Sequence, residues 1–594
     1  MPENTLRVAC DIETDSLTPT IIHCIVCQNL DTGEVHTFRQ GECYDKFRSF
    51  ADNVDLWIGH NFISFDAPVI AKLVGVSIPL SKIRDTLIMS QMHEPDRSKP
   101  EGVGPKTGPH SLESWGIRFK SAKIDFTDYL NYSEDMVTYC KQDVKLTAHL
   151  YKHLVEKMKN WSESSIVLEH QVKSIVAQQE LNGFPLDQRK ADMLVAKLEE
   201  AKDKLESDVR VEFRPLPVPH KPNALVTPKI TKAGVWSLTN IKCLGDHMKY
   251  VVGPFTRVNW PEFNLGSRPQ IGRYLIYFGW KPKVFTETGQ AQVDESILEG
   301  VNIPQAQLIQ RYLMLEKRLA QVNSWLEHMD LDSKVRGRVI TIGAVSNRMT
   351  HSTPNIAQVP QANDSTPYGK ECRECFTSGD DKDYVLFGTD ASGLELRCLA
   401  HYMGDKEYMQ EILDGDIHTK NMEAAGLTDR DQAKTFIYAF LYGAGSAKIG
   451  SIVGGNAKAG KKLIDSFLSE TPALAALKKR VADAAKRNYI QALDGRLLKI
   501  RMPHAALNQL LQGMGAIVCK QWLVEITKLY KQQQLDVQLV ASIHDEYQFI
   551  VHKDDVPKMG AVVKDAIKKA EEVLNVKCPL DCDWSVGNNW AETH

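Results

Sequence analysis

The first 165 residues alternate between strand-like and helix-like patterns of apolar positions. A strand-like run, RVACDIET, opens this segment, and apolar pieces such as DLWIGHNF follow it. Towards its end, EDMVTYCKQDVKLTAHLYKHL has apolar residues at helical spacing. The alternation predicts an α/β layer over residues 1–165.

The middle of the chain is helical apart from one insertion. Residues 166–208 have helical periodicity, which NGFPLD interrupts with a predicted turn, and the period returns in PQAQLIQRYLMLEKRLAQVNSWLEHM. Between these helices, residues 215–262 hold seven prolines, six lysines or arginines and only two acids. This basic, proline-rich composition predicts an extended surface insertion.

Two β-rich runs mark the C-terminal part of the chain. YVLFGTD has the pattern of a buried strand that leads into a helix. VQLVASIHDEYQFIV has the pattern of two strands joined at His544–Asp545–Glu546. A long helix-rich region separates the two runs, so the sequence predicts a multidomain protein of the α/β and α+β classes.

Composition limits the class of protein. The 594 residues are 43% hydrophobic and 25% charged, enough for about four domains at ~150 residues each. We expect no membrane span and no secretion signal, and the scattered cysteines favour a reduced, intracellular chain. The net charge of −3 gives no indication of a nucleic-acid partner.

Two groups of acids are candidates for chemistry. Asp11 and Glu13 lie two apart on a predicted strand and therefore on one face, whereas Tyr139 and Asp143 lie four apart on a predicted helix. Acids that converge in this way repel one another unless divalent metals bind them. Asp390 ends a strand and Asp545 lies at a hairpin turn, so a second metal centre forms if the fold brings them together.

The ordered set DxE, NxxxFD and YxxxD resembles the DnaQ-like 3′–5′ exonuclease domain, which has an RNase H-like fold. The resemblance implies that Asp11, Glu13, Asp66 and Asp143 are metal ligands and that Tyr139 assists catalysis. The alternative is that these are solvated surface acids and a packed tyrosine.

The C-terminal motifs DASGLEL, R-x3-K-x3-Y-x3-YG and HDE resemble motifs A, B and C of family A (Pol I-type) DNA polymerases, most of all their phage T7-type replicative members. That family resembles a right hand. The implied division is an exonuclease domain at 1–165, a thumb and connecting region at 166–330 containing the insertion 215–262, palm at 331–402 and 508–594, and fingers at 403–507.

The same resemblance implies roles for individual residues. Asp390, Asp545 and the carbonyl of Ala391 would hold two Mg²⁺ ions, as would the exonuclease acids, with Mn²⁺ as a substitute. The implied nucleotide-binding residues are His418, Glu395, Arg430, Lys434, Tyr438 and Tyr442, and those for DNA are Arg348, Gln512 and His544. Motif C also contains Glu546, to which no firm role is assigned.

This chain departs from the family pattern at several places. Ser346-Asn347-Arg348 stands where T-G-R is common, and asparagine tolerates the left-handed backbone that the glycine would adopt. Tyr438 in place of phenylalanine predicts acceptance of dideoxynucleotides. Cys372 and Cys375 form a C-x2-C pair, but Cys578 and Cys582 lie four apart and no histidine is near, so reduced thiols are favoured over structural zinc.

The implied partners are primer–template DNA and deoxynucleotides. Host thioredoxin at residues 215–262, a phage helicase or primase and a single-strand-binding protein are further candidates, and host cytoplasm is the expected location.

Two alternative functions of the whole chain stay open. It could be a nuclease whose C-terminal half only holds DNA, or a scaffold that clamps primer–template. Glu395 disfavours an RNA polymerase.

Overall fold

The computed structural model describes residues 5–40, 43–121, 126–220, 224–237, 239, 241–294, 297–298 and 300–593. The chain divides into two units, one made of Met1–Asp187 with His328–His594 and the other of Gln188–Glu327. None of the described helices combines the length and apolar character that crossing a membrane requires.

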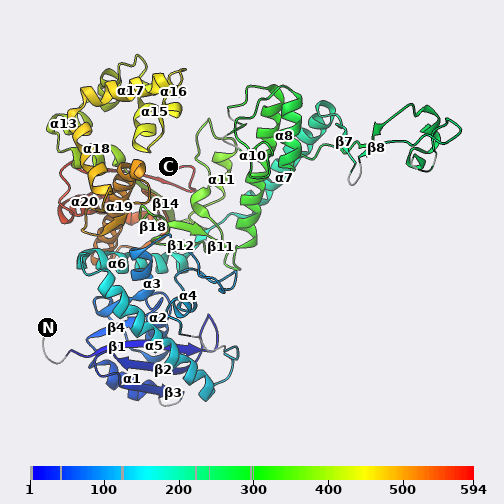
Figure 1. Cartoon of the computed structure of the whole chain (residues 1–594). Coiled ribbons are helices and arrows are strands. Elements are labelled where there is room, and N and C mark those ends of the chain that lie inside the picture. The colour runs from blue at the N-terminus through cyan, green and yellow to red at the C-terminus, as the bar shows by residue number, and fades with distance from the viewer. Residues whose placement is uncertain are drawn as a thin grey trace. The chain divides into compact units, whose positions relative to one another are not determined.

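A five-stranded mixed sheet forms the first part of the larger unit (Figure 1), in the order β3-β2-β1-β4-β5. β1 pairs antiparallel with β2 and parallel with β4. The predicted strand at residue 7 and the helix from residue 134, which packs along β1 and β2, are confirmed. The elements are β1 (Arg7–Thr14), β2 (Ile22–Asn29), β3 (Val35–Arg39), β4 (Leu56–Gly59), β5 (Ile83–Asp85), α1 (Cys43–Ala51), α2 (Asp66–Val74), α3 (Thr86–His93), α4 (Leu112–Arg118) and α5 (Glu134–Lys157).

A four-stranded antiparallel sheet in the order β17-β18-β14-β19 forms the C-terminal part of this unit. Its strands are β14 (Tyr384–Ala391), β17 (Val537–Ile543), β18 (Glu546–His552) and β19 (Cys582–Gly587). Helix α19 (Ala506–Gln532) packs against α20 (Val556–Val573), α12 (Leu394–Met403) and α6 (Glu163–Asn182). The hairpin predicted around His544 is confirmed, because only His544 and Asp545 separate β17 from β18.

A group of helices connects β14 to α19. Their starts follow the sequence, because Asp405, Asp416, Asp429 and Asn456 accept bonds from the first free amides of α13, α14, α15 and α17. The helices are α13 (Lys406–Leu413), α14 (Ile417–Ala425), α15 (Arg430–Leu441), α16 (Ser446–Ile452), α17 (Ala457–Glu470) and α18 (Pro472–Ala485), followed by the hairpin β15 (Tyr489–Gln491) and β16 (Leu497–Lys499). Shorter elements before β14 are β6 (Phe184–Pro185), β11 (Lys334–Val335), β12 (Arg338–Ile340), β13 (Thr350–Ser352) and α11 (Gly369–Glu374).

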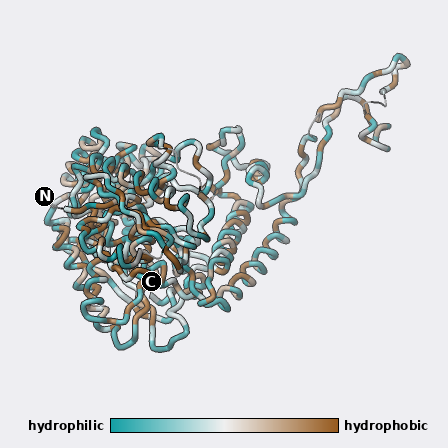
Figure 2. Tube along the Cα trace, turned by 90° about the horizontal axis from the view of Figure 1, so that it is seen from below, coloured by the Kyte–Doolittle hydropathy of each residue, from teal (hydrophilic) through white to brown (hydrophobic). Residues whose placement is uncertain are grey.

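In the described part of the smaller unit, the helices are the long α7 (Gln188–Glu212) and α10 (Pro304–Glu327) and the shorter α8 (Arg268–Tyr277). The chain between α7 and α8 forms a thin excursion (Figure 2), and residues 215–262 lie within this stretch. It contains β7 (Val218–Pro219) paired with β10 (Val258–Asn259), β8 (Leu225–Val226) paired with β9 (Phe255–Thr256), and a 3-10 helix at Lys242–Tyr250 that the sequence did not predict. At its base, the ring of Phe213 stacks on that of Phe263 with centroids 4.5 Å apart.

Candidate active sites

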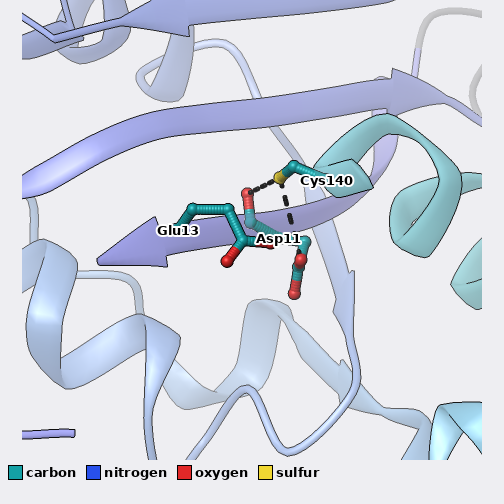
Figure 3. A group of neighbouring side chains, drawn as sticks. All are labelled: Asp11, Glu13 and Cys140. Atoms are coloured by element: carbon teal, nitrogen blue, oxygen red, sulfur yellow. Dashed lines mark hydrogen bonds between the residues drawn. The ribbon is translucent and has the colours of Figure 1, made fainter. Parts of the chain in front are cut away.

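The first site lies where β1 meets α5. Asp11 and Glu13 extend from β1 towards Cys140 on α5 (Figure 3), and one potential ligand atom of each residue lies within 4.8 Å of those of the other two. The Cys140 thiol donates to the backbone carbonyl of Asp11 at 3.5 Å, and its Sγ lies 3.7 Å from Asp11 Oδ2. The period-two geometry expected for Asp11 and Glu13 therefore places both at the same cluster.

The other predicted residues of this site adjoin the cluster. Asp66 begins α2, is buried, and accepts a hydrogen bond from the Ile12 amide at 3.2 Å, so it lies against β1. Tyr139 and Asp143 are buried on α5, and the Tyr139 ring stacks with Phe126 at 5.6 Å. The fold thus gathers the acids of all three sequence motifs.

The acids of the first site oppose one another's ionisation. Burial, then Asp11, raises the pKa of Glu13, and the same two causes hold the pKa of Asp66 well above its usual range. Burial and then Asp143 raise the pKa of Tyr139. Such a group of carboxylate oxygens fits a hard divalent cation, which would remove the repulsion.

Sequence reasoning missed Cys140. It precedes Asp143 by three residues on α5, so the two share a helical face, and that spacing could have identified it. Among the described residues, Asp11, Glu13 and Cys140 are the one group of three potential ligands found this close together. Cys372, Cys375, Cys578 and Cys582 are buried free thiols.

The second site lies at the end of β14. Asp390 is opposite Glu546 in the β14–β18 pairing, and the amide of Ala391 donates to the carbonyl of Asp545 at 3.2 Å. His544 has a φ of 57°, which closes the tight turn that carries Asp545. Folding therefore brings Asp390, Ala391 and Asp545 together, as the second metal centre requires.

Charged and aromatic groups surround these acids. Arg348 Nη2 lies 3.8 Å from Glu395 Oε1, and the Tyr442 hydroxyl donates to the same oxygen at 3.0 Å. Arg348, His544 and Asp545 line one cleft. Burial raises the pKa of Asp545, as does Glu395 to a smaller extent, whereas Arg348 opposes the shift.

Helix α15 presents the predicted cations and aromatics. Arg430 binds Asp416 with two hydrogen bonds, of 2.6 and 3.1 Å, and Lys434 is exposed. The ring centroids of Tyr438 and His418 are 6.2 Å apart. The helix ends at Leu441, so Tyr442 is its C-cap residue. Gln512 is half-buried on α19.

Glu546 faces the protein interior. It is 4% exposed, accepts from the Trp590 indole at 2.6 Å and from the Gln548 amide at 2.7 Å, and lies 3.8 Å from Arg373 Nη1. It therefore ties Trp590 of the C-terminal segment to β18.

Comparison with known proteins shows the family to which this chain belongs. Residues 242–592 match DNA polymerase family A, and residues 1–159 match a 3′–5′ exonuclease family. The chain belongs to DNA polymerase family A. It is a DNA polymerase with an exonuclease domain, and proteins of both families generally depend on divalent metals.

Relatives extend over nearly the whole polymerase chain. The DNA-directed DNA polymerase of Enterobacteria phage T3 is 34% identical, with 98% of this chain and 99% of the relative aligned. That of Escherichia phage T7 is 33% identical, with 99% and 100% aligned. A solved structure of the polymerase domain of Pol1 from M. smegmatis, in complex with DNA primer–template and dNTP, has the same fold, with a TM-score of 0.76 at 16% identity, covering 99% of this chain and 96% of that one. The expected fold class is therefore confirmed.

Proposed function

We propose that this polymerase replicates phage DNA, adding deoxynucleotides to a primer 3′-hydroxyl at the second site and removing mispaired ends at the first. One observation supports the proposal most strongly: Asp390 and Ala391 lie next to Asp545, and Asp545 and Arg348 line the same cleft. The full-length similarity to the T3 and T7 polymerases supports the replicative role. We assign the exonuclease, thumb, palm and fingers to the residue ranges predicted from the sequence.

In the polymerase site, Asp390, Asp545 and the Ala391 carbonyl offer oxygen ligands for two Mg²⁺ ions, with Mn²⁺ as a substitute. When bound, such ions assist attack by the 3′-hydroxyl on the α-phosphate and departure of pyrophosphate. The remaining residues bind and orient the reactants. Lys434, His418 and Arg430 bind the triphosphate, Glu395 and Tyr438 contact the sugar, Tyr442 lies near the template base, and Arg348, Gln512 and His544 contact the primer end and minor groove.

Binding of a triphosphate requires Arg430 to exchange partners. Its guanidinium is held by Asp416 at the start of α14, and both side chains are about half exposed. An exposed pair of this kind contributes little free energy, so a phosphate can replace the carboxylate at small cost.

In the exonuclease site, Asp11, Glu13, Asp66 and Asp143 offer ligands for a second pair of ions. Tyr139 is buried beside them, and its hydroxyl orients the attacking water. Like an ordinary tyrosine, whose pKa is about 10, Tyr139 is protonated in the neutral range and can donate a hydrogen bond, and burial raises its pKa further.

The insertion 215–262 is the proposed docking site for host thioredoxin. It exposes large apolar side chains at Leu225, Ile230, Val235, Val252 and Trp260, each more than 60% exposed. Such side chains on a basic, extended segment suit a protein partner. Longer extension products with thioredoxin, lost on deletion of 215–262, would support this. Helicase, primase and single-strand-binding protein are the other proposed partners, in the host cytoplasm.

A single primer-extension experiment tests the main proposal. A labelled primer–template is incubated with the pure chain and Mg²⁺, with and without deoxynucleotides. We expect longer products with nucleotides and shorter products without them. Shortening in both cases would instead favour a nuclease that only holds DNA, and no change in either would favour a scaffold.

A further inference from the structure

A network of buried charges lies behind the polymerase site. Glu169 on α6, Asp494 and Arg496 between β15 and β16, and Lys520 on α19 have side chains no more than 4% exposed. Arg496 donates to the carboxylates of Asp494 and Glu169. Lys520 Nζ donates to both oxygens of Glu169, at 2.8 and 2.9 Å. Two cations and two anions from three separate segments are thus paired inside one unit.

Both cations also bind Asn347. Lys520 Nζ donates to the Asn347 carbonyl at 2.9 Å, and Arg496 Nη1 donates to Asn347 Oδ1 at 3.1 Å. Asn347 is 2% exposed and has a φ of 60°, which confirms the left-handed turn predicted for it. Its carbonyl belongs to the peptide that continues into Arg348. The network therefore holds the residue next to Arg348 by both its main chain and its side chain.

Stability alone does not account for this arrangement. Desolvating four charges offsets much of their mutual attraction, and apolar side chains of similar volume stabilise an interior at least as well. A left-handed asparagine also costs about 1 kcal/mol, and it persists only where neighbours fix it. Besides pairing with the acids, both cations donate hydrogen bonds to Asn347.

We infer that Lys520 and Arg496 are positioning residues of the polymerase, which fix the Asn347 turn and so hold Arg348 at the primer end. This rests on the proposed role of Arg348. Lys520 also lines the cleft that Arg348, His544 and Asp545 share, so the distance between network and site is short. A glycine at position 347 would keep the left-handed turn but would leave Arg496 without that acceptor.

A double-mutant cycle tests the inference. Lys520→Met, Arg348→Ala and the combination are compared in single-turnover extension of a matched primer at saturating dNTP. Each single change is expected to slow extension about tenfold or more, as loss of a charged hydrogen bond does. If Lys520 acts through Arg348, the double variant is no slower than Arg348→Ala. Slowing equal to the product of the two single effects would overturn the inference and leave the proposed function intact.

Further variants separate positioning from folding. Lys528→Met is the matched control, because Lys528 lies on the same helix but is 46% exposed and pairs with Glu525. It should leave extension unchanged. Asn347→Gly keeps the carbonyl for Lys520, so it should slow extension by only about threefold, and only when Arg348 is present. Digestion of single-stranded DNA at the exonuclease site should stay normal in every variant, which reports correct folding.

Two other outcomes bear on the inference. If Asn347→Gly slows the Arg348→Ala enzyme as much as the unmodified one, the turn does not act through Arg348 and the inference fails. If Arg348→Ala alone leaves extension unchanged, the proposed primer contact itself is wrong, and the inference falls with it.

Discussion

The exonuclease site and the polymerase site both gather carboxylates, but the charges around those carboxylates differ. Around Glu13, burial and the neighbouring groups Asp11, Cys24, Asp143 and Asp66 all raise its pKa. Around Asp545, burial and Glu395 raise the pKa, whereas Arg348 and His544 lower it. The polymerase site therefore supplies part of its own counter-charge, whereas the exonuclease site depends on cations from solution.

The two sites also differ in how they are assembled. The acids of the exonuclease site come from β1, α2 and α5, all within the first 157 residues. The polymerase site combines the end of β14, the β17–β18 turn, α15 and the Asn347 turn, which the buried network holds in place. Substitutions far from the chemistry should therefore affect synthesis more often than degradation.

Replacing Asp390 with asparagine is expected to have the largest effect. The change removes a metal-binding charge while keeping the side-chain shape, so synthesis should fall about a thousandfold or more. Primer extension and primer degradation are measured on the same preparation. Degradation should continue at its normal rate, and its loss in a folded protein would contradict the assignment of two separate sites.

The reciprocal change is Asp11→Ala with Glu13→Ala. Degradation of a labelled primer should fall by a similar factor of about a thousand, because two ligands are lost from one centre. Extension of a matched primer should stay within about twofold of normal, since no part of β1 contributes to the polymerase site. A large fall in extension, with unchanged thermal stability, would show that the two centres are coupled.

Local patterns in the sequence predicted the parts of the sites that depend on local geometry. The shared face of Asp11 and Glu13 follows from strand periodicity, and the hairpin at His544 follows from two β-rich runs around a turn. The left-handed Asn347 followed from the tolerance of asparagine for that conformation.

Features that depend on packing between distant segments were not predicted. Cys140 reaches Asp11 only because α5 lies along β1, and Arg430 meets Asp416 only because α14 and α15 pack together. The partners of Lys520 come from α6 and from the turn before β13, far away in the chain. No periodicity or motif spacing encodes the contacts of Arg430 and Lys520, whereas the spacing of Cys140 from Asp143 could have shown only which face of α5 Cys140 occupies.

Tyr438→Phe should change the choice of nucleotide without abolishing synthesis. A dideoxynucleotide lacks the 3′-hydroxyl of the normal substrate. In the proposed complex, the hydroxyl of Tyr438 makes the contact that this 3′-hydroxyl would make. Removal of the Tyr438 hydroxyl therefore disfavours dideoxynucleotides. Discrimination against dideoxynucleotides should rise about tenfold, which corresponds to the free energy of one hydrogen bond. The ratio of dideoxy- to deoxynucleotide incorporation measures this, and an unchanged ratio would refute the role of Tyr438. Degradation by the same variant should be normal.

Glu13→Gln should produce the smallest effect, a gain in stability without metal. Because folding raises the pKa of Glu13, its ionisation opposes folding increasingly as the pH rises above the unfolded value of about 4.3. The neutral variant should therefore be more stable than the unmodified chain at pH 8 in EDTA, by about 1 kcal/mol, and the difference should disappear at low pH. Thermal unfolding across this pH range measures the gain, and Mg²⁺ should stabilise the variant less. Asp545→Asn is the matched control: burial and Glu395 also raise the pKa of Asp545, but Arg348 offsets part of that charge, so the gain there should be smaller, and an equal gain would show that the two sites do not differ in this respect.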